Sequence, residues 1–186
     1  MKIIGISGSL RTTSRSTALL KTAATLTPYG VNLSVYDGLG YLPHFNPDLD
    51  REPLPSAVSD FRSQLNSSAG VIISTAEYAH GVPGVLKNAL DWIVASGELY
   101  DKPVALFSPS RRGYLAQASL IETLTVMTAR LIPDAFINVS LRSRMEDGES
   151  DLTSNVDLPA RVERSLALFA KAIDPTHIAA TGMHQN

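Results

Sequence analysis

The sequence predicts an α/β protein, built as a doubly wound parallel sheet with helices on both faces. Short runs of β-branched and other apolar residues alternate along the chain with segments whose apolar residues recur at helical spacing. Each helical segment is long enough to return the chain to the same end of the sheet. Because such sheets bind ligands outside the carboxyl ends of their strands, functional residues are expected in the loops after strands one, three and four.

Five strands are predicted from apolar runs that end at turn residues. The first contains Ile3, Ile4 and Ile6 and stops at Ser7-Gly8-Ser9, as a buried strand followed by a tight turn does. The third is nearly all apolar. The five strands are expected over residues 3–6, 31–36, 70–75, 104–107 and 135–139.

Five helices are predicted from apolar residues at helical spacing. Ser14 is a suitable N-cap for the first helix, and Pro83 suits the first turn of the third, which continues to Ile93. The five helices are expected over residues 14–26, 56–65, 83–93, 120–131 and 159–172.

Length and composition predict a single domain. The chain has 186 residues, of which 44% are hydrophobic and 18% charged, and this is enough for one core of ordinary depth. The domain is expected over residues 1–173, followed by a polar C-terminal tail over residues 174–186. The proline-rich segment, residues 37–55, has no periodicity and is not expected to form a separate domain.

Charge and cysteine content narrow the function classes. A formal charge of −2 argues against nucleic acid or an anionic membrane as the main partner, since both need a dense basic face. Without cysteine, redox chemistry requires a bound cofactor. The histidines lack the spacing of metal ligands, so no metal is expected. The N-terminal apolar stretch is too short for a signal peptide or a membrane span, which predicts a cytoplasmic protein.

The loop after the first strand, residues 8–16, carries the chemistry of an oxyanion site. Five hydroxyl residues surround Arg11 and Arg15 at the start of a helix, where backbone N–H groups and the positive helix end attract a phosphate. The alternative is that the hydroxyls only cap the helix while the arginines are solvated. The glycine fingerprints of dinucleotide and Walker sites are absent, so the loop suits a single terminal phosphate.

A second loop extends this interpretation to a known family. Residues 8–14 read GSLRTTS, and residues 77–92 read EYAHGVPGVLKNALDW. Together they resemble the NADPH-dependent FMN reductase family, whose members typically show Gly-Ser-x-Arg-x-x-Ser after strand one and Glu-Tyr-Asn-x-x-x-Pro-Gly-x-Leu-Lys-Asn-x-x-Asp-Trp after strand three. The resemblance extends over about residues 1–173 and implies a flavodoxin-like fold.

The resemblance implies an FMN site assembled from three loops. The phosphate is expected on Ser9, Arg11, Ser14 and Ser16. The edge of the isoalloxazine ring is expected along Glu77, Tyr78 and Ala79. The third loop, residues 108–114, normally lies beside the flavin and the pyridine nucleotide, which adds Ser108 and Gly113.

Three features depart from the family pattern. Ser16 stands where asparagine is common, although a hydroxyl can still bond to phosphate. Ala79-His80 replaces a common Asn-Tyr pair, which removes a side-chain hydrogen bond but leaves the backbone groups. The third loop has one glycine where many members have several. In the same loop, Arg111 and Arg112 are either solvated or form a site for the 2′-phosphate of NADPH.

The resemblance further implies an FMN-dependent NAD(P)H oxidoreductase. Its acceptor would be a small molecule: a quinone, an azo or nitro compound, a metal oxyanion or free flavin, reduced by ping-pong hydride transfer. The alternatives are a flavodoxin-like electron carrier, which usually relies on a pronounced charged face, and a non-redox flavin- or phosphate-binding module. A homodimer or homotetramer is expected, with contacts from the proline-rich segment and the helix after Pro83. Lys87-Asn88 and Asp91-Trp92 on that helix are expected to fix the loop after the third strand or form a subunit contact.

Overall fold

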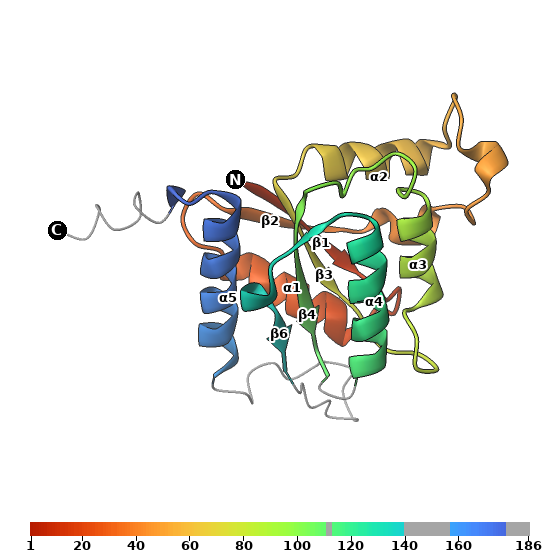
Figure 1. The fold of residues 1–186 in the computed structure, drawn as a ribbon. Coiled ribbons are helices and arrows are strands. Elements are labelled where there is room, and N and C mark those ends of the chain that lie inside the picture. Colours follow the sequence, from red (N-terminus) through yellow and green to blue (C-terminus); the bar gives the residue numbers. More distant parts are fainter. Residues whose placement is uncertain (111–112, 140–156, 178–186) are drawn as a thin grey trace.

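The fold is a parallel sheet between two layers of helices (Figure 1). The computed structural model describes residues 1–110, 113–139 and 157–177. The strand order is β2-β1-β3-β4-β5, and β6 also pairs with β4. The strands are β1 (Lys2–Ser7), β2 (Asn32–Tyr36), β3 (Gly70–Ser74), β4 (Pro103–Ser108), β5 (Arg130–Leu131) and β6 (Ile137–Asn138). Along the chain, β2 is added on one side of β1, and β3 and β4 are added on the other side. Loops at such a switch point in strand order form a crevice at the carboxyl ends of the strands.

The helices cover both faces of the sheet. They are α1 (Arg15–Thr25), α2 (Ser56–Asn66), α3 (Gly84–Asp91), α4 (Tyr114–Val126) and α5 (Leu158–Ile173). On one face α1 and α5 pack against Ile72 of β3. On the other face α2, α3 and α4 pack against Val71 and Ile73 of the same strand. Successive residues of a strand point to opposite faces, so the nearly all-apolar β3 fills both cores.

The start of α1 confirms the predicted N-cap. Ser14 has extended backbone geometry, and its Oγ accepts a hydrogen bond from the N–H of Thr17 at 3.3 Å. The prediction for α3 needs a correction, because Pro83 is its N-cap rather than a first-turn residue and the helix ends at Asp91, before Ile93. α2 and α5 lie within a residue of their expected limits.

The helix predicted over residues 120–131 is wrong at both ends. α4 begins at Tyr114 and stops at Val126. Thr128 has a φ of 57°, and in this left-handed conformation it turns the chain out of the helix. Residues 130 and 131 then pair with β4 as the short strand β5.

The fifth strand, predicted over residues 135–139, is also different in the structure. Two short strands, β5 and β6, lie along the same side of β4, and a 3₁₀ turn over Pro133–Ala135 separates them. Pro133 has no N–H to give to a ladder, and Phe136 donates its N–H to the carbonyl of Pro133 instead. Only Ile137 and Asn138 remain to pair with Phe107 and Ser108.

The proline-rich segment is held by α3 and by the residue that follows it. Trp92 is completely buried, and its Nε1 donates to the carbonyl of Pro43 at 2.7 Å. Asn88 donates to the same carbonyl at 2.9 Å and accepts the N–H of Phe45 at 2.7 Å. The Phe45 ring meets Trp92 edge-on at a centroid distance of 5.1 Å. Asn88 and Trp92 therefore fix the proline-rich segment, not the loop after β3 that the sequence predicts they would fix.

Candidate functional site

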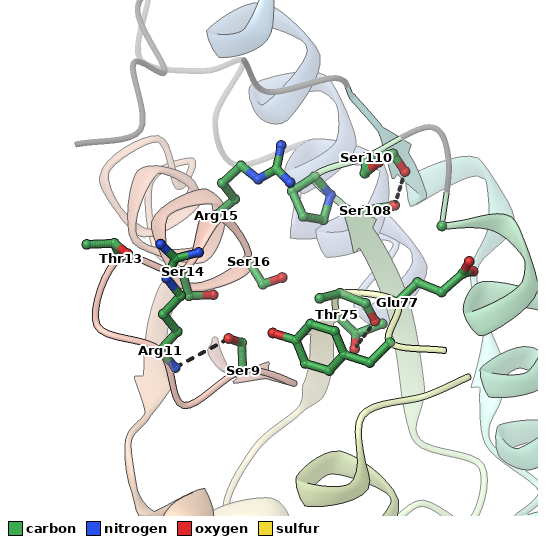
Figure 2. Close-up of a pocket in the computed structure, with 14 residues that line it drawn as sticks. Ser9, Arg11, Thr13, Ser14, Arg15, Ser16, Thr75, Glu77, Ser108 and Ser110 are labelled. Atoms are coloured by element: carbon green, nitrogen blue, oxygen red, sulfur yellow. Dashed lines mark hydrogen bonds between the residues drawn. The ribbon is translucent and has the colours of Figure 1, made fainter. Parts of the chain in front are cut away.

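A pocket of about 290 Å³ lies at the carboxyl ends of β1, β3 and β4 (Figure 2). Three loops line it, and they are the loops in which the sequence predicts functional residues. Small-molecule sites commonly measure roughly 300–1,000 Å³, so the pocket is at the lower end of that range. Every predicted site residue except Ala79 lines it, namely Ser9, Arg11, Ser14, Ser16, Glu77, Tyr78, Ser108 and Gly113.

The loop between β1 and α1 brings hydroxyl groups and one guanidinium to the N-terminus of α1. Ser16 and Ser14 are almost fully buried, whereas Arg11 is exposed. The Oγ of Ser9 accepts the Arg11 N–H at a long 3.4 Å within the bend of the loop. Hydroxyl donors, a cation and a helix N-terminus together form a donor set that fits a phosphate monoester.

Close backbone packing joins the first loop to the second. The N–H of Gly8 donates to the carbonyl of Ser74 at 2.8 Å. A Cβ on Gly8 would lie only 2.4 Å from Oγ1 of Thr75, so the glycine is what allows these two loops to touch. The loop whose donors fit a phosphate and the carboxyl end of β3 therefore form one continuous wall of the pocket.

The loop between β3 and α3 turns tightly at the pocket rim. Tyr78 and Gly81 exchange two backbone hydrogen bonds, at 3.2 and 2.9 Å. Between them Ala79 and His80 both have positive φ, at 48° and 61°. Ala79 sits at this exposed tip and does not line the pocket. The Tyr78 side chain lines the pocket and is still 57% exposed, so it lies at the entrance.

The loop after β4 forms the opposite wall. Ser108 is buried, and its Oγ donates to the carbonyl of Ser110 at 2.7 Å (Figure 2). Gly113 lines the pocket immediately before α4. The predicted role of Arg111 and Arg112 lies outside the described residues.

Sequence reasoning missed six lining residues. They are Thr13, Arg15, Thr75, Ala76, Pro109 and Ser110. Each is a neighbour of a predicted residue in the same loop, so the signal was the loop itself rather than any one side chain. Arg15, in the first turn of α1, lines the same pocket as Ser108 and Ser110 of the β4 loop (Figure 2), a proximity that sequence spacing does not reveal.

Within residues 1–110, 113–139 and 157–177, no cluster of three or more metal-ligating side chains occurs. Over the same residues, no helix is both long and apolar enough to cross a membrane.

Comparisons with known proteins identify the fold and the family. The chain is similar to FerB, a flavoenzyme NAD(P)H:(acceptor) oxidoreductase from Paracoccus denitrificans, with a TM-score of 0.75 and 25% identity over 91% of this chain and 97% of that one. A WrbA-like flavodoxin from Agrobacterium tumefaciens has the same fold, at a TM-score of 0.56 and 16% identity over 92% of this chain and 96% of the other. The fold is thus flavodoxin-like.

Two curated relatives are similar in sequence. An NAD(P)H-dependent FMN reductase from Pseudomonas aeruginosa is 32% identical over 157 residues, which cover 82% of this chain and 84% of the relative. A quinone reductase from Escherichia coli is 30% identical over 106 residues, about half of each protein, at 56% and 55%. The family model for NADPH-dependent FMN reductases matches residues 1–142. The chain therefore belongs to the NADPH-dependent FMN reductase family.

Proposed function

We propose that this protein is an FMN-dependent NAD(P)H oxidoreductase that passes electrons to a small-molecule acceptor. The observation that carries the proposal is the pocket at the switch point, whose three loops gather hydroxyls, two guanidinium groups, a helix N-terminus and the aromatic side chain of Tyr78. The hydroxyls, the guanidinium groups and the helix N-terminus suit a phosphate, and the aromatic side chain suits a flat ring. FMN has both.

The residues divide into a phosphate end and a ring end. Ser9, Arg11, Ser14 and Ser16 would hold the phosphate, because they are the hydroxyl and cationic groups at the start of α1. Glu77 and Tyr78 would follow the edge of the ring, whereas Ala79, which the sequence also predicts there, lies at the exposed tip outside the pocket. Ser108 and Gly113 would close the opposite side.

The chain's own contribution to the reaction is binding and orientation. FMN, when bound, supplies the redox chemistry by taking electrons from NAD(P)H and giving them to an acceptor. The protein fixes the ring between two loops and leaves its entrance open beside the half-exposed Tyr78. Backbone N–H groups near the ring can stabilise the negative charge of the reduced cofactor. This work needs positioning rather than an acid–base residue.

Quinones are the acceptor class that we propose first. The E. coli relative is a quinone reductase, and a Burkholderia relative that is 38% identical over 92 residues is a 2-hydroxy-1,4-benzoquinone reductase. A planar acceptor can stack at the entrance next to Tyr78. Azo and nitro compounds, metal oxyanions and free flavin are the other candidate acceptors.

Steady-state kinetics test this proposal. The protein is saturated with FMN, and oxidation of NADPH and of NADH is followed with and without benzoquinone. Oxidation that depends on both FMN and benzoquinone is expected. If neither nucleotide is oxidised, the enzyme proposal fails. If the flavin is reduced only by a partner redox protein, the chain is an electron carrier.

We also propose that the protein is a homodimer or homotetramer in the cytoplasm. Tyr41 and Leu49 of the proline-rich segment are exposed, at 81% and 45%, although they are large and apolar. A second copy that covers them would remove this apolar surface from water. Light scattering coupled to gel filtration measures the mass, and a monomer at micromolar concentration would contradict the proposal. Cell fractionation tests the location.

A further inference from the structure

Glu77 makes a contact to a neighbouring loop that its position in a flavin-edge loop does not suggest. Its Oε2 accepts the backbone N–H of Ala116, in the first turn of α4, at 2.8 Å. The two residues are 39 positions apart in the chain, and α4 begins directly after Gly113, which lines the pocket as Glu77 does. Figure 2 shows the carboxylate turned toward α4 and away from Arg11, Ser14 and Ser16.

Among the described residues, none beside the N-terminus of α4 caps it with a side chain. Its N-cap residue is Gly113, which has no side chain, and the first turn contains no acidic residue. Ala116 is the third helical residue, and its N–H is the group that an N-cap side chain normally bonds. Gly113 also has φ −86° and ψ 38°, outside the extended conformation from which a side chain usually caps.

Glu77 occupies the place that a local cap would fill. A Cβ on Gly113 would lie 3.6 Å from the Cβ of Glu77, in ordinary van der Waals contact. The carboxylate therefore lies over the first turn of α4 and faces the positive end of the helix, where a negative charge is stabilised. The positive N-terminal end of α4 balances the negative charge of the Glu77 carboxylate, which does not point toward the ligand site.

We infer that Glu77 is a positioning residue. Its carboxylate, carried by the β3–α3 loop, caps the N-terminus of α4 and so holds the two walls of the pocket at a fixed separation. Tyr78 follows Glu77 directly, and Gly113 precedes α4 directly, so both walls move if this hydrogen bond is lost. The role at the flavin rests on the proposed function, whereas the capping role does not.

Two substitutions at Glu77 test the inference. Glu77→Ala removes the acceptor, and hydrogen exchange of the Ala116 amide in the FMN-free protein should accelerate about tenfold, as expected for the loss of one hydrogen bond. The FMN dissociation constant, from quenching of flavin fluorescence, should rise by a similar factor of about ten. Glu77→Gln keeps an acceptor oxygen but loses the negative charge at the helix N-terminus, so both quantities should change by about two- to fivefold, less than in Glu77→Ala.

Glu122→Ala is the matched control, because Glu122 is an exposed carboxylate on α4 and its removal changes the net charge equally. It should alter neither Ala116 exchange nor FMN affinity. Wild-type exchange and affinity in Glu77→Ala would overturn the inference, and so would a Glu77→Gln variant as impaired as Glu77→Ala. A wild-type protein that does not bind FMN would overturn the proposed function instead, while the exchange rates would still decide the capping role.

Discussion

Two consecutive residues at the pocket rim, Ala79 and His80, hold a backbone conformation that side chains other than glycine rarely adopt. Their φ angles of 48° and 61° close the turn between Tyr78 and Gly81. Left-handed backbone costs an ordinary residue about 1–2 kcal/mol, and asparagine tolerates it better than alanine does. The turn is thus under strain that its sequence does not relieve, at the point where a ligand would enter.

Ala79→Asn should therefore stabilise the protein, by about 0.5 kcal/mol in the free energy of unfolding. Ala118→Asn, at an exposed position inside α4, is the matched control and should destabilise it by about 0.6 kcal/mol, because asparagine is a poor helix former. Urea unfolding of both variants measures the two values. A loss of stability in both would contradict the strain at Ala79.

Arg11 and Ser16 should contribute to FMN affinity in distinguishable ways. Arg11 is exposed and charged, while Ser16 is buried and neutral. Arg11→Ala should cost more affinity than Ser16→Ala, since bonds to charged groups contribute about 1.5–3 kcal/mol and neutral ones about 0.5–1.5. Arg11→Ala should also flatten the dependence of FMN affinity on salt, because an exposed ion pair is screened. Flavin titrations at low and high salt measure both effects, and equal salt slopes in the two variants would argue against the role of Arg11.

At the scale of elements, α3 acts as a clamp for the proline-rich segment. Asn88 makes two hydrogen bonds to that segment, through Pro43 and Phe45. Asn88→Ala should lower the free energy of unfolding by about 1–3 kcal/mol, the sum of two such bonds. Lys87→Ala is the control, because the exposed Lys87–Asp91 ion pair is expected to contribute less than about 0.5 kcal/mol. Equal losses in the two variants would contradict the clamp.

Tyr36 links β2 to α2 and should make stability depend on alkaline pH. Burial, the nearby Asp60 carboxylate and a hydrogen bond to it raise the pKa of Tyr36 from 10.0 to about 12. The raised pKa means that the folded protein keeps this proton where the unfolded chain has lost it. The stabilisation is fully present below pH 10.0 and is lost as the pH approaches about 12.

Tyr36→Phe should remove this part of the pH dependence. Wild type should lose stability more steeply than the variant between about pH 10 and about pH 12, as measured by urea unfolding at a series of pH values. Tyr29→Phe, at a tyrosine that is 84% exposed, should follow the wild-type curve. Parallel curves for wild type and Tyr36→Phe would refute the assignment.

Elements with local signals were the ones that the sequence predicted well. β1 and β3 are apolar runs that end at turn residues, and α1 begins directly after its N-cap Ser14. α4 was misplaced because its cap comes from Glu77, which is distant in sequence. The fifth strand was predicted too long because the 3₁₀ turn over Pro133–Ala135 takes up its first residue, and β5 lies within the helix predicted over residues 120–131. Only pairing with β4 shows that β5 and β6 belong to one edge.

At the scale of the whole molecule, the site is where three loops meet. Each loop carries its own sequence signal, and the family resemblance links the first two. The contacts between loops depend on packing, as at Gly8 against Thr75 and Glu77 against α4, and no spacing in the sequence encodes them. The pocket consequently forms because the strand order places β1, β3 and β4 side by side.

The central claim is that this pocket holds FMN in a form that NAD(P)H can reduce and a small molecule can reoxidise. The most direct measurement is the visible absorbance of the purified, FMN-loaded protein under anaerobic conditions. Addition of NADPH or NADH should bleach the protein-bound flavin, and benzoquinone added afterwards should restore the oxidised spectrum. A bound flavin that neither nucleotide bleaches, or a protein that retains no FMN after gel filtration, would contradict the claim.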